Sequence, residues 1–268
     1  MENSAGTPSS TRGHGWPRIV LSVVSHGQGA LVRLLLADID KYCDVRSIHV
    51  VLTLNIVEPL PFVPGEYRFP VSVIENSIPT GFGANHNAAY RHLPSDFYCV
   101  ANPDIRLTAD PFPVLLDYAT RVGRIGIVAP AIRGAGGEAE NSARRFPTPW
   151  KILRKYFGTR RLIEYPHNDS TYFPDWIAGM FMLVPSTVYA EMKGFDERYF
   201  LYYEDVDFCG RLRLAGYEVA CCPQAVVSHV AQRDSHRKAK YRVWHVRSMV
   251  RFFSSAVFMR LMWRRLWC

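Results

Sequence analysis

Short runs of apolar and mostly β-branched residues alternate with segments of helical spacing from residue 18 onward. Five such runs occur in the first half of the chain: Ile19–Ser25, Ile48–Leu54, Val71–Glu75, Phe97–Ala101 and Ile125–Ala129. Runs of this kind are typical of strands buried on both faces, and helical segments between them favour a parallel sheet. We therefore predict an α/β fold with a mostly parallel central sheet flanked by helices. Ligands bind such sheets at the carboxyl ends of the strands, so the residues there are the first candidates for a site.

Further elements follow from composition and spacing. Residues Gly81–Asn87 are rich in Gly and Asn and are predicted to form a loop before a helix at Ala88–His92. The later predicted elements are a buried strand at Trp176–Val184, a helix at Asp205–Ala215, and two short strands at Val219–Cys222 and Ala225–Val230.

The segment before the predicted domain differs from it in composition. Residues 1–17 are rich in Ser, Gly and Thr and lack an apolar run, which predicts a disordered leader and not a secretory signal. No apolar stretch approaches the ~20 residues that a membrane-spanning helix needs. The six cysteines lack metal-ligand spacing and are expected to be reduced core residues. We expect a domain over residues 18–235 and a cytoplasmic location.

The tripeptide Asn102-Pro103-Asp104 follows the apolar run Phe97–Ala101. In an extended segment, residues two apart project to the same side, so Asn102 and Asp104 present two oxygen ligands together. Pro103 ends the strand because it has no backbone N–H to donate. Such a pair suits Mg²⁺ or Mn²⁺ bridging a diphosphate. The same tripeptide is also a common turn.

Residues Glu204–Asp207 place three carboxylates at the start of a predicted helix. A helix N-terminus favours negative charge, so the cluster can serve as a cap alone. The cluster is flanked by Phe200, Tyr202 and Tyr203, and carboxylates among aromatic side chains are costly unless they bind something. The functional interpretation is a general base with a neighbour that orients an acceptor hydroxyl.

Two further signals are less specific. The glycines of Gly81–Asn87 let backbone amides approach a phosphate or ribose beside a helix N-terminus, but an ordinary loop has the same composition. His229 lies near the end of the last predicted strand, Ala225–Val230. It is either a structural residue or a further metal ligand through a ring nitrogen.

Taken in order, these segments resemble glycosyltransferase family 2, and within it the rhamnosyltransferase-like enzymes of polysaccharide and O-antigen assembly. The matching stretches are GFGANHNAAY, YCVANPDIRL, DWIAGMFMLVPS, GFDERYFLYYEDVDFCGRLRLAGY and CPQAVVSH. The resemblance covers Ile19 to His229 and is most specific in the second half. It implies a GT-A (Rossmann-like) fold, a Mg²⁺ or Mn²⁺ cofactor and inversion at the anomeric carbon.

The resemblance also implies roles by position. Asp205 looks like the catalytic base, with Glu204 beside it. Asp104 and His229 look like the metal ligands. The acceptor-binding residues would be Asp175, Trp176 and Gly179, which are similar to the acceptor-side motif of the family, together with Glu204. The donor nucleotide site would be formed by Ser25, Asn55, Gly81, Phe82, Asn85, Asn87 and Asn102.

Two strand ends depart from the family pattern. The first strand of the family usually ends in a Thr-Tyr-Asn-like sequence, and this chain has Ser25-His26-Gly27. The second usually ends in Val-Asp-Asn, whose aspartate contacts the base, and here the run Leu52–Asn55 contains no acid. Both departures concern the recognition of the nucleotide base and therefore the choice of donor.

The reaction that the resemblance implies is a single displacement. Asp205 would remove the proton from the acceptor hydroxyl as that hydroxyl attacks the anomeric carbon. The metal on Asp104 would act as a Lewis acid toward the departing nucleoside diphosphate. The resemblance favours dTDP-rhamnose as the donor and a saccharide linked to polyprenyl diphosphate as the acceptor.

The last segment, residues 236–268, is basic and aromatic. No Asp or Glu follows Asp234, and the whole chain has a formal charge of +8. A helix over Tyr241–Trp267 would place Arg and Lys beside Trp and Phe, as interfacial helices do on anionic lipid. We expect peripheral attachment to the inner face of the cytoplasmic membrane; the alternative is a helix packed on the domain with solvated arginines. No recognition motif for nucleic acid accompanies the charge.

Two other functions stay open at this point. A sugar nucleotidyltransferase shares the architecture, but Ser25–Gly29 lacks the Lys or Arg that a triphosphate would require. A catalytically degenerate, membrane-associated partner of another transferase is favoured by the absent acid near Leu54. The intact pairs of Asn102 with Asp104 and of Glu204 with Asp205 argue against it.

Overall fold

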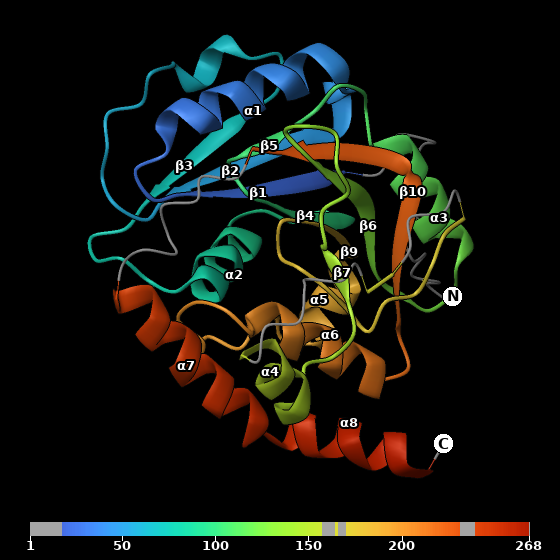
Figure 1. The fold of residues 1–268 in the computed structure, drawn as a ribbon. Coiled ribbons are helices and arrows are strands. Elements are labelled where there is room, and N and C mark those ends of the chain that lie inside the picture. Colours follow the sequence, from blue (N-terminus) through green and yellow to red (C-terminus); the bar gives the residue numbers. More distant parts are fainter. Residues whose placement is uncertain (1–17, 157–163, 166–169, 231–238, 268) are drawn as a thin grey trace, which may run out of the picture.

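A mixed sheet of eight strands runs through the middle of the described part of the chain, in the order β3-β2-β1-β4-β9-β6-β10-β5 (Figure 1). The computed structural model describes residues 18–156, 164–165, 170–230 and 239–267, so the predicted leader lies outside the described residues. The strands of this sheet are β1 (Ile19–Ser25), β2 (Ile48–Leu54), β3 (Val71–Glu75), β4 (Phe97–Ala101), β5 (Ile105–Arg106), β6 (Ile125–Gly134), β9 (Phe181–Pro185) and β10 (Glu218–His229). A separate pair joins β7 (Ala143–Arg144) to β8 (Trp176–Ile177).

Strands β1 to β4 form the parallel part of the sheet that the apolar runs predict. Their observed bounds match the predicted ones residue for residue. β1 pairs with β2 from Ile19 opposite Ile48 onward, and with β4 on its other side. Alternate side chains point to opposite faces: Leu21 and Val23 belong to one buried cluster and Val20 to the other.

The other half of the sheet is mixed. β9 lies antiparallel between β4 and β6, and β10 pairs in parallel with β6. The two short strands predicted at Val219–Cys222 and Ala225–Val230 form one long strand, β10, with a register shift between Cys222 and Val226. Pro223 lies in this interval, and proline within a strand is expected at such irregularities.

Helices cover both faces of the sheet (Figure 1). α1 (Gly29–Tyr42) and α3 (Phe112–Arg121) contribute to one buried cluster; α2 (Phe82–His92), α5 (Ser186–Glu191) and α6 (Glu204–Leu214) contribute to the other. Three further helices are α4 (Pro149–Tyr156), α7 (Ala239–Phe253) and α8 (Ala256–Trp267); α7 and α8 add Phe252, Phe258 and Leu261 to the second cluster. None of the helices in the described ranges is long and apolar enough to cross a membrane.

Two predicted elements are divided in the structure. The predicted strand Trp176–Val184 is split into β8 and β9, with Gly179 in the connection. The predicted tail helix is split into α7 and α8. The Ser255 hydroxyl accepts a hydrogen bond from the Phe258 N–H over 3.1 Å, which is the contact of an N-cap residue and accounts for the new helix start.

Candidate active site

The carboxyl ends of β1 and β2 lie side by side, and the Glu58 carboxylate, from the segment after β2, is bound at this point. The Ser25 hydroxyl donates a hydrogen bond to Glu58. The N–H groups of Gln28 and Gly29, at the start of α1, donate to the same carboxylate over 3.2 and 3.0 Å. Glu58 therefore occupies the anion-favouring N-terminus of α1. The sequence pattern does not predict a role for Glu58, which lies in the irregular segment after β2.

The end of β2 is joined to α2 by a cluster of polar side chains. The Asn55 carboxamide oxygen accepts from the Thr80 N–H over 2.8 Å and from Asn76 Nδ2 over 2.9 Å. The Asn85 carboxamide oxygen accepts from the Thr80 hydroxyl and from Asn76 Nδ2, both over 2.7 Å. Two predicted donor-site residues, Asn55 and Asn85, are thus brought together. Both are buried, and these bonds hold the edge of the sheet against α2.

The prediction of a loop at Gly81–Asn87 is wrong, because α2 already begins at Phe82. Its glycines allow close packing. A Cβ on Gly81 would lie 2.8 Å from the Phe200 carbonyl oxygen, and one on Gly83 would lie 2.7 Å from Phe195 Cβ. The glycines therefore let the helix approach the segment that leads into α6.

Asn87 is also placed differently from its prediction at the donor. Its Nδ2 donates to the Phe195 carbonyl over 2.9 Å, and its Oδ1 accepts from the Phe195 N–H over 2.9 Å and from the Tyr189 hydroxyl over 2.7 Å. The side chain is buried, so these internal bonds use its polar groups within the fold. Phe82, by contrast, remains partly exposed beside Gly179.

Asp104 and His229 meet where β5 and β10 pair. Asp104 Oδ2 lies 3.1 Å from His229 Nε2, and Glu140 Oε2 lies 3.0 Å from the other ring nitrogen, Nδ1. Burial alone would lower the pKa of His229. The adjacent carboxylates of Asp104 and Glu140 outweigh burial and raise the pKa above its usual value.

This group has the chemistry of a partial site for a divalent cation. Asp104 Oδ1 is buried and has no hydrogen-bond partner among the described residues, so a hard oxygen ligand is left over. In the described ranges, no three His, Cys, Asp or Glu side chains form a complete metal site. Mg²⁺ is commonly held by one or two carboxylates together with substrate phosphates. Glu140, which the sequence reading did not single out, orients His229 as carboxylates behind metal-binding histidines do.

The N-terminus of α6 follows two residues in a left-handed conformation. Tyr202 and Tyr203 both have φ of 70°. For bulky side chains such a conformation costs about 1–3 kcal/mol each and persists only where the surroundings hold it, often at functional sites. It places Glu204 and Asp205 in the first turn of α6, where the helix favours negative charge.

Asp205 is the more accessible of these two carboxylates. Its Oδ2 accepts from the Gly179 N–H over 3.1 Å and its Oδ1 from the Val206 N–H over 2.8 Å. Burial raises the pKa of Asp205, and the hydrogen bonds from Gly179 and Val206 and the charge of Arg144 offset only part of this rise. A carboxylate with a raised pKa is better suited to accept a proton near neutral pH.

Glu204 is only 5% exposed, and its Oε2 has no hydrogen-bond partner in the described part of the chain. Burial, and then the charge of Asp205, raise the pKa of Glu204 well above its usual value. A protonated Glu204 can therefore remain beside an ionised Asp205. Of the two predicted catalytic carboxylates, Asp205 is thus the one that reaches the surface.

Gly179, one of the predicted acceptor residues, lies against Asp205. A Cβ on Gly179 would lie 3.2 Å from the Phe82 ring and 3.8 Å from Asp205 Cβ. The next residue, Met180, accepts a backbone hydrogen bond from Asn102 over 2.9 Å. The Gly179-Met180 segment therefore connects the α6 carboxylates with the Asn102–Asp104 tripeptide.

The other two predicted acceptor residues lie behind this segment. Asp175 accepts from the Phe146 N–H over 2.7 Å. Trp176 is buried, and its indole N–H donates to the Arg145 carbonyl over 3.1 Å. The Arg144 guanidinium lies 5.2 Å from the centre of the Trp176 ring. Asp175 thus holds the backbone at Phe146, and Trp176 holds Arg144, which the sequence analysis does not single out.

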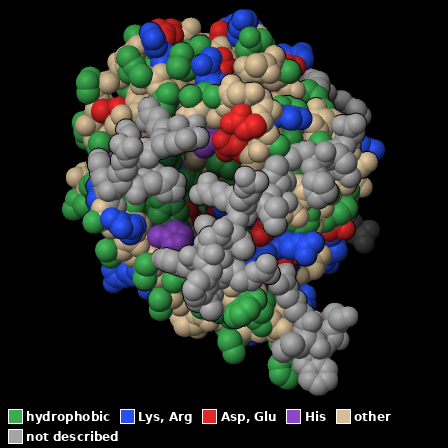
Figure 2. Space-filling model, in the orientation of Figure 1, with side chains coloured by type: hydrophobic (Ala, Val, Ile, Leu, Met, Phe, Trp, Pro, Cys, Tyr) green, Lys and Arg blue, Asp and Glu red, His purple; other side chains and the backbone are tan. Residues whose placement is uncertain are grey.

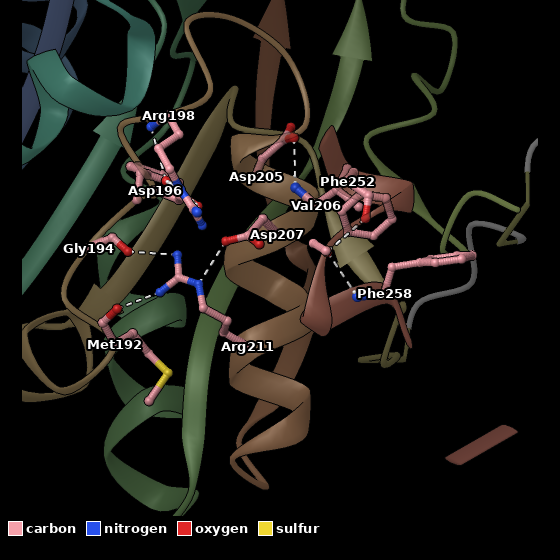
Figure 3. A network of polar contacts seen from close by, with 12 residues as sticks. Met192, Gly194, Asp196, Arg198, Asp205, Val206, Asp207, Arg211, Phe252 and Phe258 are labelled. Carbon is pink, nitrogen blue, oxygen red and sulfur yellow. Dashed lines mark hydrogen bonds and ion pairs between the residues drawn. The ribbon is translucent and has the colours of Figure 1, made fainter. Parts of the chain in front are cut away.

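Asp207 points away from Asp205, toward Arg211 (Figure 3). The pair lies 2.8 Å apart, and Arg211 also donates to the carbonyls of Met192 and Gly194. Asp207 thus anchors the segment before α6. Figure 2 shows that the face viewed in Figure 1 is hollowed near its centre, with Asp and Glu side chains at the rim of the hollow.

Comparison with known proteins agrees with this geometry. Residues 23–248 match the family described as glycosyltransferase like family 2. The chain belongs to this family. It is therefore a nucleotide-sugar glycosyltransferase, and its fold is of the GT-A type.

Two relatives and one solved structure illustrate the similarity. The chain is 26% identical over 247 residues to rhamnosyltransferase WbbL of Escherichia coli, covering 88% of this chain and 92% of that one. It is 31% identical over 169 residues to an N-acetylglucosaminyl-diphospho-decaprenol L-rhamnosyltransferase of Mycobacterium tuberculosis, covering 59% of this chain and 55% of the relative. A mannosyltransferase structure from Pyrobaculum calidifontis, in complex with GDP-Man and Mn²⁺, has a TM-score of 0.56 at 15% identity, covering 89% and 65% of the two chains.

Proposed function

We propose that this glycosyltransferase transfers rhamnose from dTDP-rhamnose to a hydroxyl group of a glycan linked to polyprenyl diphosphate, with inversion at the anomeric carbon. Two relatives are named as rhamnosyltransferases, and the name of one includes a diphospho-decaprenol acceptor. These names support the choice of sugar and of acceptor class.

The observation that carries the proposed mechanism is the setting of Asp205. Two backbone N–H groups, from Gly179 and Val206, hold the carboxylate in one orientation at the start of α6. Burial raises its pKa, although it remains partly exposed. Asp205 would accept the proton of the acceptor hydroxyl as that oxygen attacks the anomeric carbon. A single displacement needs no covalent intermediate, so the product would have the opposite anomeric configuration.

Asp104 and His229 would hold the divalent cation, with Asn102 beside the diphosphate. When bound, the cation would neutralise negative charge that develops on the leaving nucleoside diphosphate. Two observations support this assignment: Asp104 Oδ1 has no hydrogen-bond partner in the part of the chain that the structure describes, and Glu140 orients His229. Alignment of donor and acceptor on the two sides of the Gly179-Met180 segment would supply much of the remaining rate enhancement.

A donor screen by thermal unfolding tests the proposal first. Nucleoside diphosphates and nucleotide sugars are added with and without Mg²⁺ or Mn²⁺. A ligand present at a hundred times its Kd stabilises the native state by ~2.7 kcal/mol, which for a chain of this size raises the Tm by roughly 5–10 °C. We expect this shift with dTDP-rhamnose and a cation. The absence of a shift with every nucleotide would favour the catalytically degenerate partner.

Substitution of single carboxylates tests the roles. Asp205→Asn should lower turnover by ~10²–10⁴-fold and keep donor binding. Asp104→Asn should abolish the cation-dependent part of donor binding. Asp117→Asn is the matched control, since Asp117 is an exposed carboxylate paired with Arg121 on α3. Unchanged turnover in Asp205→Asn, or a product whose NMR spectrum shows retained configuration, would contradict the mechanism.

A further inference from the structure

Helix α7 packs one of its faces on the loop that precedes Glu204. The Trp244 ring lies 4.6 Å from the Phe200 ring, measured between centroids. The Ser248 hydroxyl donates to the Leu201 carbonyl over 2.9 Å. This face of α7 is therefore fixed on the domain and holds the loop that presents the catalytic carboxylates.

The opposite face of α7 is apolar and exposed. Val243, Val246 and Val250 are 63%, 50% and 58% exposed, and their spacing of three and four residues places them in one stripe. Exposed cations border this stripe. With 3.6 residues per turn, Lys240 and Arg247 fall on one side of the stripe and Arg242 on the other.

Helix α8 carries a similar surface. Met259 and Trp263 are 63% and 65% exposed and lie four residues apart, with the exposed Arg260 beside them. α7 and α8 follow one another along the outer rim of the domain (Figure 1). The valine stripe, Met259, Trp263 and the four bordering cations are here called the docking face.

The charge of the docking face is of one sign. No Asp or Glu follows Asp234 in the sequence, so neither helix carries an acid that would neutralise these cations. A second copy of the chain would bring like charges together in a symmetric contact, which is unfavourable. Apolar side chains bordered by Lys and Arg, with Trp among them, are what helices use at the surface of an anionic bilayer.

We propose that the docking face binds the surface of an anionic phospholipid bilayer. The valines, Met259 and Trp263 enter the headgroup region, and the bordering cations pair with lipid phosphates. α7 and α8 are 15 and 12 residues long, which suits helices that lie in the interface and do not cross it. The proposal depends on this surface alone and on neither the donor nor the acceptor.

Docking would bring the active site to the membrane. Because the other face of α7 holds the loop before Glu204, that loop would lie about one helix diameter, ~10 Å, from the lipid. An acceptor anchored in the bilayer could then approach Asp205 while its lipid stays in the membrane.

The test is flotation of the full chain with vesicles of phosphatidylcholine alone, or of phosphatidylcholine mixed with phosphatidylglycerol. Binding is expected only to the mixed vesicles, and it should weaken with salt. A variant with the four bordering cations changed to Gln should lose roughly fivefold in binding per cation. A variant with Val243→Ser, Val246→Ser and Val250→Ser should also lose binding, although its charge is unchanged.

The matched control removes four exposed cations elsewhere: Arg33→Gln, Lys41→Gln, Arg121→Gln and Arg133→Gln. It should bind as the wild type does. Equal loss in this control, or no binding by the wild type, would overturn the proposal. So would a valine variant that converts a dimer to a monomer in sedimentation velocity while it still binds vesicles. The donor-induced Tm shift, measured without vesicles, reports separately on the proposed function and on whether each variant is folded.

Discussion

The contact between α2 and the loop before Asp205 makes Gly81→Ala a sharp perturbation. A Cβ at Gly81 would lie 2.8 Å from the carbonyl oxygen and 2.9 Å from the Cα of Phe200, and backbone atoms cannot rotate away. The same carbonyl accepts the Phe82 N–H over 2.9 Å, so separating the segments also weakens that bond. Overpacking costs ~1–3 kcal/mol and a lost hydrogen bond ~1 kcal/mol. We expect the free energy of unfolding to fall by about 2–4 kcal/mol, which lowers the Tm by roughly 5–15 °C.

The turnover number should fall with the stability, because displacement of the loop moves the carboxylate that follows it. A misplacement of ~1 Å can cost about a hundredfold in rate. Circular dichroism on heating gives the Tm, and initial rates at saturating donor give kcat. Gly123→Ala is the control, since a Cβ there would meet no atom within 4 Å. If Gly81→Ala and Gly123→Ala had the same Tm and kcat, the inference that α2 sets the position of the loop before Glu204 would be refuted.

Two further predictions concern buried titratable groups. Burial raises the pKa of Glu204 in the folded chain, so the stability that the protonated side chain contributes is lost as the pH rises from the ordinary glutamate pKa through the folded pKa. Glu204→Gln should therefore raise the Tm relative to wild type at pH 8, with little difference at pH 4. Burial lowers the pKa of His86 to about 3. Below the ordinary histidine pKa of ~6.5, the unfolded chain therefore binds a proton at His86 that the folded chain does not bind. The free energy of unfolding then falls by up to ~1.4 kcal/mol per pH unit as the pH drops below ~6.5. His86→Gln should flatten this part of the stability profile in urea titrations, and the exposed control His92→Gln should leave it unchanged.

The sheet was predictable where the sequence pattern has a single physical explanation. Continuous β-branched runs such as Ile19–Ser25 and Ile48–Leu54 can be satisfied only by burial on both faces, and their bounds agree with the structure. The start of α2 was not predictable in this way. Gly and Asn have low helix propensity, and the bonds that compensate, such as Asn87 to Phe195, join residues 108 positions apart.

The candidate site likewise contains residues that local sequence motifs predict and residues that they do not. Local motifs predict Asp104 and Asp205, because a strand end or a helix start concentrates their signal within a few residues. Glu58 and Glu140 lie in irregular segments without periodicity, and their partners Ser25 and His229 are 33 and 89 positions away. Such residues become visible only when the chain is folded.

The left-handed Tyr202 and Tyr203 join α7 to the candidate active site. Each costs about 1–3 kcal/mol and persists only where its surroundings hold it. The Tyr203 ring lies 5.6 Å from that of Phe252 and 5.5 Å from that of His245, both on α7, and the latter also contacts Tyr202 at 5.3 Å. α7 therefore supplies the packing that offsets the strain of the loop before Asp205. The family match extends to residue 248 and so includes most of this helix, as expected if α7 is part of the structure that positions Asp205.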